Sequence, residues 1–393
     1  MSSLKPHKTK VLLLIDWFLP GTASGGPVRS YANMMAQLQT DYEFYVITRH
    51  TDYGSSEPYS VIPPNQWVQQ GENWYGYYLS QDQLHQKTLK NLLEQTAFDV
   101  ALINGIYSWY FSIYPLVVLK RLNVPYLVSA RGMLNPQAFS VKPLKKRVFL
   151  QLAKIIKLYH RVPFHATNSQ EAAYIRVVLG SRTKIYEAPN VPRPIPAKPT
   201  QRNAKQHPVR LVSVARVAKE KGTLRLLKAL ERLSTPVHLD LYGPIYDTDY
   251  WAVCKTQVEK LPEHIAVHYQ GPLESELVPK TLLDYDFFAM LSEGENFGHA
   301  ILEALSSGLP VLISNRTPWT NLRAERVGWD VALEDKNDIQ KAFTEALSMP
   351  QEVYSLWSDA AYNYANDFCS NPELVAQTKE MLAAVIKDFE NAK

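Results

Sequence analysis

At 393 residues the chain is too long for one ordinary domain and long enough for two, each with its own buried core. Charged residues make up 20% of it and the net charge is +4, as in a soluble globular protein, and no low-complexity tract is present. The two cysteines, Cys254 and Cys369, exclude a disulfide framework and lack metal-ligand spacing, which favours a reducing cytoplasm.

Short apolar strands alternate with helical patterns throughout the first half, which is typical of parallel α/β sheets. We expect strands at 11–15, 43–48, 100–103, 126–129 and 164–167. Pro27 opens the first helix, and Asn168 with Glu171 predicts the capped start of a later one. The uncharged run 101–119 is interrupted by polar residues and proline, so we expect strand, loop and helix there, not a membrane span.

Six prolines between residues 189 and 208 predict a linker, after which strands begin again. Strands are expected at 209–214, 239–241, 266–270, 287–291 and 310–313, and a last helix near 372–389. The predicted organisation has an N-terminal domain at 1–189, a linker at 190–208 and a C-terminal domain at 209–371. The helix within 372–393 is expected to pack back on the N-terminal domain.

The most informative stretch of the chain runs from Ser292 to Glu303 and reads Ser-Glu-Gly-Glu-Asn-Phe-Gly-His-Ala-Ile-Leu-Glu. Glu295 precedes a Gly turn, and Glu303 lies in a helical pattern that Gly308 ends. A loop carboxylate, the N–H groups of a helix start and a helix carboxylate are thus expected to converge. The N–H groups suit a phosphate and the carboxylates suit sugar hydroxyls, so the stretch predicts a sugar-nucleotide pocket.

With Asn-Phe-Gly-His and Gly-Leu-Pro-Val in register, this stretch resembles the E-x7-E signature of family 4 retaining glycosyltransferases. The resemblance implies the GT-B fold, an α/β architecture of two Rossmann-like parallel-sheet domains facing across a cleft. It also implies a nucleoside-diphosphate sugar as donor. In that family Glu303 would bind the ribose hydroxyls and Glu295 those of the donor sugar. The backbone of Phe297, Gly298 and His299 would bind the phosphate or the sugar.

Two cations stand five residues apart just after the strand expected at 209–214. Arg216 emerges at the carboxyl end of that strand, where open α/β sheets bind ligands, and Lys221 follows in the same loop. By resemblance the pair grips the donor diphosphate, whose charge grows as the C1–O bond breaks. Lys219 lies in the same loop, but the spacing favours Lys221.

Gly25 and Gly26, between the first strand and helix, resemble the glycine loop that approaches the donor phosphates or the acceptor in that family. Neither G-x-G-x-x-G nor G-K-[ST] occurs, which disfavours a dinucleotide dehydrogenase and a P-loop enzyme. Arg131 is expected to contact phosphate or acceptor, or to form a structural salt bridge. Asn104 stands where many members carry His, and Asp16 and Asp52 are weaker candidates.

Three further patterns lie in the C-terminal half of the chain. Trp319 follows the strand after the E-x7-E helix and is expected to pack in a loop or the core. Asp247-Thr-Asp249 and Asp284-Tyr-Asp286 both match D-x-D, a short pattern that is common by chance. Since enzymes of the GT-B fold usually hold the diphosphate with fixed cations, we expect no metal and no other cofactor.

Residues 142–161 form a basic amphipathic stretch, in a half of the chain that carries 20 Lys and Arg against 11 Asp and Glu (residues 1–189). It suits either solvent or an anionic membrane surface, where lipid-linked acceptors reside. No nucleic-acid-binding motif accompanies this charge, so no nucleic-acid partner is expected. The protein is expected in the cytoplasm, with peripheral binding to the inner face of the plasma membrane.

The sequence therefore predicts a retaining glycosyltransferase that moves a sugar to a glycan or lipid-linked acceptor in surface-polysaccharide biosynthesis. Two alternatives stay open. One is a sugar-nucleotide epimerase or a phosphorylase on the same fold. The other is a non-catalytic protein that binds a sugar nucleotide or serves as a membrane scaffold.

Overall fold

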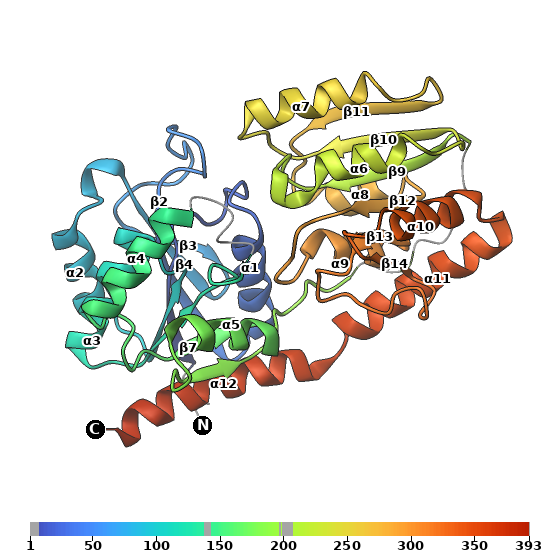
Figure 1. Ribbon diagram of the computed structural model, residues 1–393. Helices are drawn as coiled ribbons and strands as arrows, with labels where there is room; N and C mark the ends of the chain where they lie inside the picture. The colour runs from blue at the N-terminus through green and yellow to red at the C-terminus, as the bar shows by residue number, and fades with distance from the viewer. Residues whose placement is uncertain (1–7, 137–142, 196–197, 199–206, 393) are drawn as a thin grey trace. The chain divides into compact units, whose positions relative to one another are not determined.

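The computed structural model describes residues 8–136, 143–195, 198 and 207–392 (Figure 1). The chain divides into two compact units. Unit 1 comprises Met1–Arg193 together with Asn371–Lys393, and unit 2 comprises Pro194–Ser370. Of the linker expected at 190–208, residues 196–197 and 199–206 lie outside the described part of the chain. Asn190 and Val191 are buried within unit 1, so that unit extends past residue 189.

Unit 1 is built on an eight-stranded sheet with the strand order β3-β4-β2-β1-β5-β6-β7-β8. The strands are β1 (Thr9–Leu14), β2 (Tyr42–Arg49), β3 (Trp67–Gly71), β4 (Trp74–Leu79), β5 (Val100–Asn104), β6 (Tyr126–Ser129), β7 (Phe164–Ala166) and β8 (Ile185–Glu187). All pairs are parallel except β3 with β4, an antiparallel pair joined by a tight connection. The expected N-terminal strands are confirmed, whereas the β3–β4 pair was not anticipated and makes this sheet mixed.

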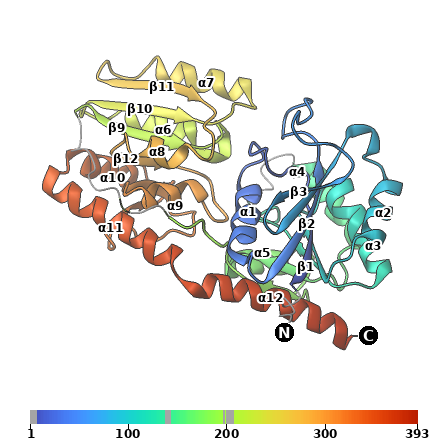
Figure 2. The same ribbon diagram turned by 180° about the vertical axis from the view of Figure 1, so that it is seen from behind.

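Helices cover both faces of the unit 1 sheet. They are α1 (Gly26–Leu38), η1 (Gln81–Gln83), α2 (Gln86–Gln95), η2 (Trp109–Ile113), α3 (Tyr114–Leu122), α4 (Pro143–Ile155), α5 (Ser169–Leu179) and α12 (Pro372–Asn391). On one face, α1 and α12 bury Tyr31, Met35 and Leu382 against alternate residues of β1 and β2. The other face packs against α2, α3, α4 and α5. Figure 2 shows α12, from the end of the chain, running beside the strands of this unit.

Unit 2 has a six-stranded, wholly parallel sheet with the order β11-β10-β9-β12-β13-β14. Its elements are β9 (Val209–Val214), η4 (Lys219–Lys221), α6 (Thr223–Leu230), β10 (Val237–Tyr242), α7 (Thr248–Val258), β11 (Ile265–Gly271), α8 (Val278–Leu282), β12 (Phe287–Met290), α9 (His299–Ser306), β13 (Val311–Ser314), β14 (Gly328–Val331), α10 (Lys336–Ser348) and α11 (Gln351–Cys369). The strands expected in this half of the chain are confirmed, and β14 is additional.

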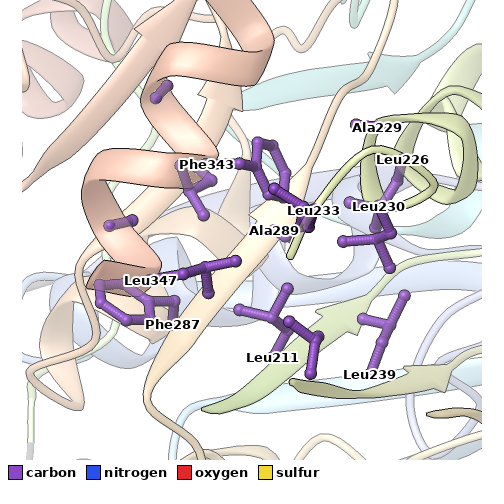
Figure 3. Packing of buried hydrophobic residues seen from close by; sticks show 14 of the residues in the cluster. Leu211, Leu226, Ala229, Leu230, Leu233, Leu239, Phe287, Ala289, Phe343 and Leu347 are labelled. Carbon is purple, nitrogen blue, oxygen red and sulfur yellow. The ribbon is translucent and has the colours of Figure 1, made fainter. Parts of the chain in front are cut away.

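Strand alternation divides the apolar side chains of unit 2 between two cores. Leu211, Leu239 and Phe287 point to the face that α6 and α10 cover, as Figure 3 shows. Val212, Phe288 and Ile313 point to the opposite face, under α8 and α9. The centre of the sheet is therefore buried on both faces. Polar side chains that reach solvent are expected at the ends of the strands and on the edge strands.

Among the described residues, none of the helices combines the length and the apolar composition that crossing a bilayer requires. The uncharged run 101–119 forms β5, η2 and the first part of α3, as the sequence predicted.

Candidate active site

The loop after β9 owes its conformation to a glycine. Gly222 has φ +72°, and a Cβ on it would stand 1.9 Å from the carbonyl oxygen of Leu291, which follows β12. Only glycine therefore allows the η4 turn to lie against the end of β12. The Glu293 N–H donates to the Glu220 carbonyl at 2.8 Å and holds the two loops together.

This backbone contact brings Lys221 to Glu295, although the two are far apart in the sequence. The Lys221 Nζ lies 2.6 Å from the Glu295 Oε1, and both side chains are largely buried, with 21% and 10% exposed. The Glu295 N–H donates to the Arg316 carbonyl at 3.1 Å, which anchors the carboxylate's own loop. One predicted cation and one predicted carboxylate thus form a partly desolvated ion pair at the carboxyl edge of the sheet.

Arg216 follows β9 by two residues and is more exposed than Lys221. Its guanidinium donates to Glu220 at 3.2 Å, one helical turn further along the chain. The backbone beneath it is tightly packed, because a Cβ on Gly243 would stand 2.1 Å from the Ala215 carbonyl oxygen. An exposed ion pair of this kind is weak, so the Arg216 side chain is able to exchange Glu220 for a stronger anion.

The start of α9 is shaped by Gly298 and Trp319. Gly298 has φ +83°, and its Cβ position is occupied by the Ile301 side chain at 2.8 Å. Trp319 is buried and donates its indole N–H to the Phe297 carbonyl at 2.6 Å. The predicted packing role of Trp319 is confirmed, and it fixes the peptide that precedes the helix. The N–H groups of a first helical turn have no acceptor within their helix and carry partial positive charge.

His299 and Glu303 stand four residues apart on α9 and therefore share one face of it. Both are half-buried, while Ile301 and Leu305 point into the core. The helix thus presents a basic and an acidic side chain together, one turn apart.

Three charged residues of this edge were not anticipated from the sequence. Glu293 pairs with Arg225 and, at 2.7 Å, with Arg316. Arg225 also donates to the Leu291 carbonyl at 3.1 Å. These contacts tie the loops after β12 and β13 to α6. Their positions in the sequence could have identified two of them, because Glu293 and Arg316 both follow the carboxyl end of a parallel strand.

In unit 1 the predicted glycine loop also follows a strand. Gly25 has φ +86° and caps α1, and a Cβ on it would meet nothing within 4 Å. Asp52 accepts hydrogen bonds from the Thr22 and Ala23 N–H groups at 3.2 and 3.3 Å. Asp52 therefore supports the loop, and Gly25 leaves open space beside its backbone among the described residues.

Asp16 lies at the carboxyl end of β1 with two partners. Ser108 donates to its carboxylate at 2.8 Å, and Arg49 lies 3.4 Å from the same oxygen. Burial raises the pKa of Asp16, against the lowering effect of those two contacts. Asn104 is buried at the end of β5, and its Oδ1 has no hydrogen-bond partner among the described residues.

Arg131 is held by neutral groups. Its guanidinium donates to Asn190 at 2.5 Å and stacks over Tyr31, with 4.3 Å to the ring centroid. The structural salt bridge considered for Arg131 is absent from the described part of the chain, which was not evident from sequence because Asn190 comes from the expected linker. The neighbouring Gly132 N–H donates to Glu171 at 2.6 Å.

His165, on β7, was not singled out in the sequence, yet it is buried beside Arg131. Its Nε2 lies 2.8 Å from the Ala188 carbonyl oxygen and its Nδ1 lies 3.0 Å from the Ser129 hydroxyl. Burial and, secondly, the charge of Arg131 lower the pKa of His165 to about 4. The imidazole is therefore neutral at pH 7, with Nε2–H as the donor to the carbonyl.

Both D-x-D patterns use a carboxylate to organise the backbone. Asp247 caps α7 by accepting from the Tyr250 N–H at 2.9 Å. Asp286 is buried and accepts from the Arg210 N–H at 2.7 Å, between β12 and β9. These two hydrogen bonds account for the positions of Asp247 and Asp286.

The second half of the chain is similar to one known protein family. Residues 195–364 match the sequence profile of the family described as "Glycosyl transferases group 1". This segment holds Arg216, Lys221, Glu295 and Glu303, so these four candidate residues all lie within the part of the chain that matches this family. A search of curated proteins gives no sequence match.

Solved structures resemble the chain over nearly its whole length. Sucrose-phosphate synthase from Thermosynechococcus elongatus is 14% identical, with a TM-score of 0.69 and coverage of 97% of this chain and 100% of that one. Anabaena HepE, solved with UDP and glucose, is 14% identical, with a TM-score of 0.68 and coverage of 96% and 100%. WaaG, a glycosyltransferase involved in lipopolysaccharide biosynthesis, is 15% identical, with a TM-score of 0.63 and coverage of 95% and 99%.

At these identities the likeness establishes the architecture. The chain has two α/β units with parallel or mostly parallel sheets, and it has the GT-B fold of these glycosyl-transfer proteins.

Proposed function

We propose that the protein is a retaining glycosyltransferase, similar to family 4, that uses a nucleoside-diphosphate sugar. The observation that carries the proposal is the 2.6 Å ion pair between Lys221 and Glu295. The bond broken in glycosyl transfer joins a sugar to a phosphate. A cation suited to the phosphate and a carboxylate suited to the sugar hydroxyls must therefore lie side by side, as these two do.

In this proposal the donor sits at the carboxyl edge of the unit 2 sheet. The first turn of α9 and the Phe297–Gly298–His299 backbone bind phosphate or sugar, and Glu303 binds the ribose hydroxyls. Glu295 accepts hydrogen bonds from the donor sugar. Arg216 exchanges Glu220 for the diphosphate, and Lys221 shares its charge between Glu295 and that anion. Gly25 and Gly26 of unit 1 approach the donor or the acceptor with bare backbone.

The chemical step breaks the C1–O bond to the diphosphate and forms a C1–O bond to the acceptor on the same face of the sugar. The acceptor hydroxyl gives its proton to the departing phosphate oxygen, so no protein nucleophile is required. Arg216 and Lys221 stabilise the negative charge that accumulates on the diphosphate. Because that charge is larger in the transition state than in the ground state, their contribution raises the rate of the step. No metal or other cofactor takes part.

The acceptor in this proposal is a glycan or lipid-linked saccharide of surface-polysaccharide biosynthesis, and the surface of α4 supports it. An apolar ridge runs along this helix and just beyond it, with side chains 50–74% exposed: Leu144, Val148, Leu152, Ile155 and Ile156. Their spacing places them on one helical face. The opposite side is anchored in unit 1, where Ala153 and Leu158 are buried.

Basic side chains border this apolar ridge. Lys145, Arg147, Lys154 and Lys157 are all exposed, whereas Lys142 lies outside the described residues. Five apolar side chains facing solvent are unusual in a monomer, and a cationic border fits the anionic headgroups of a bilayer. We therefore infer peripheral binding to an anionic membrane, which would bring unit 1 to a lipid-linked acceptor on the cytoplasmic side.

Acceptor-dependent release of nucleotide distinguishes this proposal from its rivals. The purified chain is incubated with UDP-, GDP- and dTDP-sugars, with and without a lipid-linked saccharide extract, and free nucleoside diphosphate is measured. A transferase releases nucleotide only in the presence of acceptor. An epimerase converts the donor without releasing nucleotide, a phosphorylase requires inorganic phosphate, and a scaffold consumes nothing. Any of these three outcomes would refute the transferase.

A further inference from the structure

A cluster of metal-ligating side chains lies on the two strands at one edge of the unit 2 sheet. Strands β10 and β11 pair in parallel, with Asp240 beside His268 and His238 beside Ala266. His238 and Asp240 are two residues apart and so project from the same face of β10. Leu239, between them, points into the apolar core on the other face. The register therefore gathers two imidazoles and a carboxylate at one place.

The three ligand atoms are close enough to share one ion. The His238 Nε2 lies 3.4 Å from the Asp240 Oδ1, and the His268 Nδ1 lies 3.7 Å from the same oxygen. Ligands at ~2.0–2.1 Å from a tetrahedral zinc ion are about 3.3 Å apart. The two imidazole nitrogens are 2.6 Å apart, as in a hydrogen bond, and they would separate by less than 1 Å to bind the ion together. Both imidazoles are partly exposed and free to make that shift, with 31% and 53% of their side chains accessible.

The carboxylate is fixed by groups outside the cluster. Asp240 is 4% exposed, the Tyr285 hydroxyl donates to its Oδ2 at 2.6 Å, and the Gln270 amide donates to its Oδ1 at 3.0 Å. Burial and the hydrogen bond to Asp240 both raise the pKa of Tyr285, which keeps its hydroxyl a donor. Metal-binding side chains are commonly oriented by such hydrogen bonds from their neighbours.

The electrostatics of the cluster also favour a cation. Within the described ranges, the basic groups closer than 4 Å to the Asp240 carboxylate are the two imidazoles alone. A carboxylate that is this buried is stabilised by a cation that binds it directly. Two nitrogens and one oxygen suit zinc and its neighbours in the periodic table, whereas Mg²⁺ and Ca²⁺ prefer oxygen.

We propose that His238, Asp240 and His268 bind one divalent transition-metal ion, with Zn²⁺ as the expected species. Solvent supplies the remaining ligand on the exposed side of His268. The ion would fasten β11, the edge strand, to β10. His238 is the second residue of β10, near its amino end, whereas the candidate active site gathers at the carboxyl ends of the strands. This metal is therefore structural and separate from glycosyl transfer.

The experiment uses the full-length chain, stripped of metal with EDTA and dialysed. Titration with Co²⁺ is followed by visible absorption, and titration with Zn²⁺ by calorimetry. We expect one ion per chain, loss of that binding in His238→Ala and His268→Ala, and a roughly 10–100-fold weaker affinity in Tyr285→Phe. His207→Ala is the matched control, because His207 is an exposed histidine of the same unit outside the cluster.

Circular dichroism of each variant verifies the fold, and the Tyr285→Phe result keeps the test informative if an alanine variant unfolds. The proposal is overturned if the wild-type chain binds no ion stoichiometrically. It is equally overturned if binding survives in both histidine variants, or falls as much in His207→Ala as in them.

Discussion

At the scale of single residues, the two cations after β9 differ in their surroundings. Lys221 is paired with Glu295 at 2.6 Å and mostly buried, whereas Arg216 pairs with Glu220 in a more exposed position. A cation that is already desolvated and fixed costs little reorganisation when a diphosphate develops charge. Lys221 is therefore better placed than Arg216 to stabilise the charge on the diphosphate. Arg216 must first break its ion pair with Glu220.

We predict that Lys221→Ala and Arg216→Ala each lower kcat by roughly 10²–10³-fold, the usual cost of removing one group that stabilises transition-state charge. Lys219→Ala is the control, since Lys219 is an exposed lysine of the same turn and should leave kcat close to that of the wild type. Steady-state release of nucleotide measures the effect. Equal losses in all three variants, or none in any, would contradict the assignment.

His165 makes stability depend on pH. Its pKa is about 4 in the folded chain, below the ordinary value of 6.5, because it is buried. Between those values the unfolded chain binds a proton that the folded chain does not, so the free energy of unfolding is fully retained above pH 6.5 and falls as the pH drops towards 4. One such group changes it by at most about 1.4 kcal/mol per pH unit.

We therefore expect the Tm to fall between pH 7 and pH 5, and to fall less steeply in His165→Gln, whose amide can still donate to the Ala188 carbonyl. His160→Gln, at an exposed histidine of the same unit, should keep the slope of the wild type. Differential scanning calorimetry at several pH values measures this. If the Tm falls with pH at the same rate in all three proteins, a group other than His165 is responsible for the loss of stability in acid.

Sequence reasoning reached the individual residues of the site but not their partners. Glu295 and Lys221 were found from their motifs, while the 2.6 Å contact between them depends on how Gly222 packs against Leu291. His165 and Asn190 could not be found, because a lone histidine in a strand and an asparagine among prolines carry no periodic signal. Their importance comes from burial next to Arg131, which only the tertiary structure shows.

At the scale of elements, strands with continuous apolar runs were predicted within one or two residues, as β6 and β9 illustrate. The hairpin of β3 and β4 was missed, because its aromatic and glutamine residues lack an apolar run and its strands are partly exposed. The start of α5 was predicted, since Asn168 accepts from the Glu171 N–H as a cap. The Glu171 carboxylate instead binds the Thr167 and Gly132 N–H groups, which links the helix to the Arg131 loop.

The loop after β9 tests whether glycine positions Lys221. Gly222→Ala should lower both the Tm and kcat, because the new Cβ would collide with the Leu291 carbonyl and displace the turn. Strain from positive φ alone costs roughly 1–3 kcal/mol. Gly271→Ala separates the two effects, since Gly271 has φ +83° in open space. Gly222→Ala should lower the Tm and kcat more than Gly271→Ala does. Equal losses in the two variants would mean that the close contact between Gly222 and the Leu291 carbonyl does not position Lys221.

The apolar ridge on α4 predicts binding to anionic liposomes. Replacing Leu152, Ile155 and Ile156 by Ser should weaken co-sedimentation at all salt concentrations. Replacing Lys145, Lys146 and Arg147 by Gln should weaken it mainly at low salt, since each cation near the surface contributes about 1 kcal/mol that salt screens.

Val177→Ser is the control for the ridge, because Val177 is 82% exposed on α5 and lies outside it. Donor binding should be unchanged in every variant, since none of the replaced residues belongs to the proposed donor site. Liposome binding that is absent from the wild type, or unchanged in both triple variants, would contradict the membrane proposal.

At the scale of the whole molecule, the alternation of strands and helices gave two α/β units, and the prolines marked the region between them. The proposal assigns donor binding to unit 2 and uses protein cations in place of a metal. EDTA should consequently leave turnover essentially unchanged, even as it removes an ion from the His238–Asp240–His268 site. Loss of activity with EDTA and recovery with Mg²⁺ or Mn²⁺ would contradict the metal-free step.

The most direct test of the central claim is thermal unfolding of the purified chain with a panel of nucleoside-diphosphate sugars. A ligand at 100 times its Kd stabilises the native state by about 2.7 kcal/mol, and ~2–4 °C accompanies each kcal/mol in a domain of this size. We predict that at least one donor raises the Tm of the wild type by several degrees, and that Glu303→Ala abolishes the shift. If no nucleoside-diphosphate sugar raises the Tm, or if the shift is unchanged in Glu303→Ala, the proposed donor site is wrong.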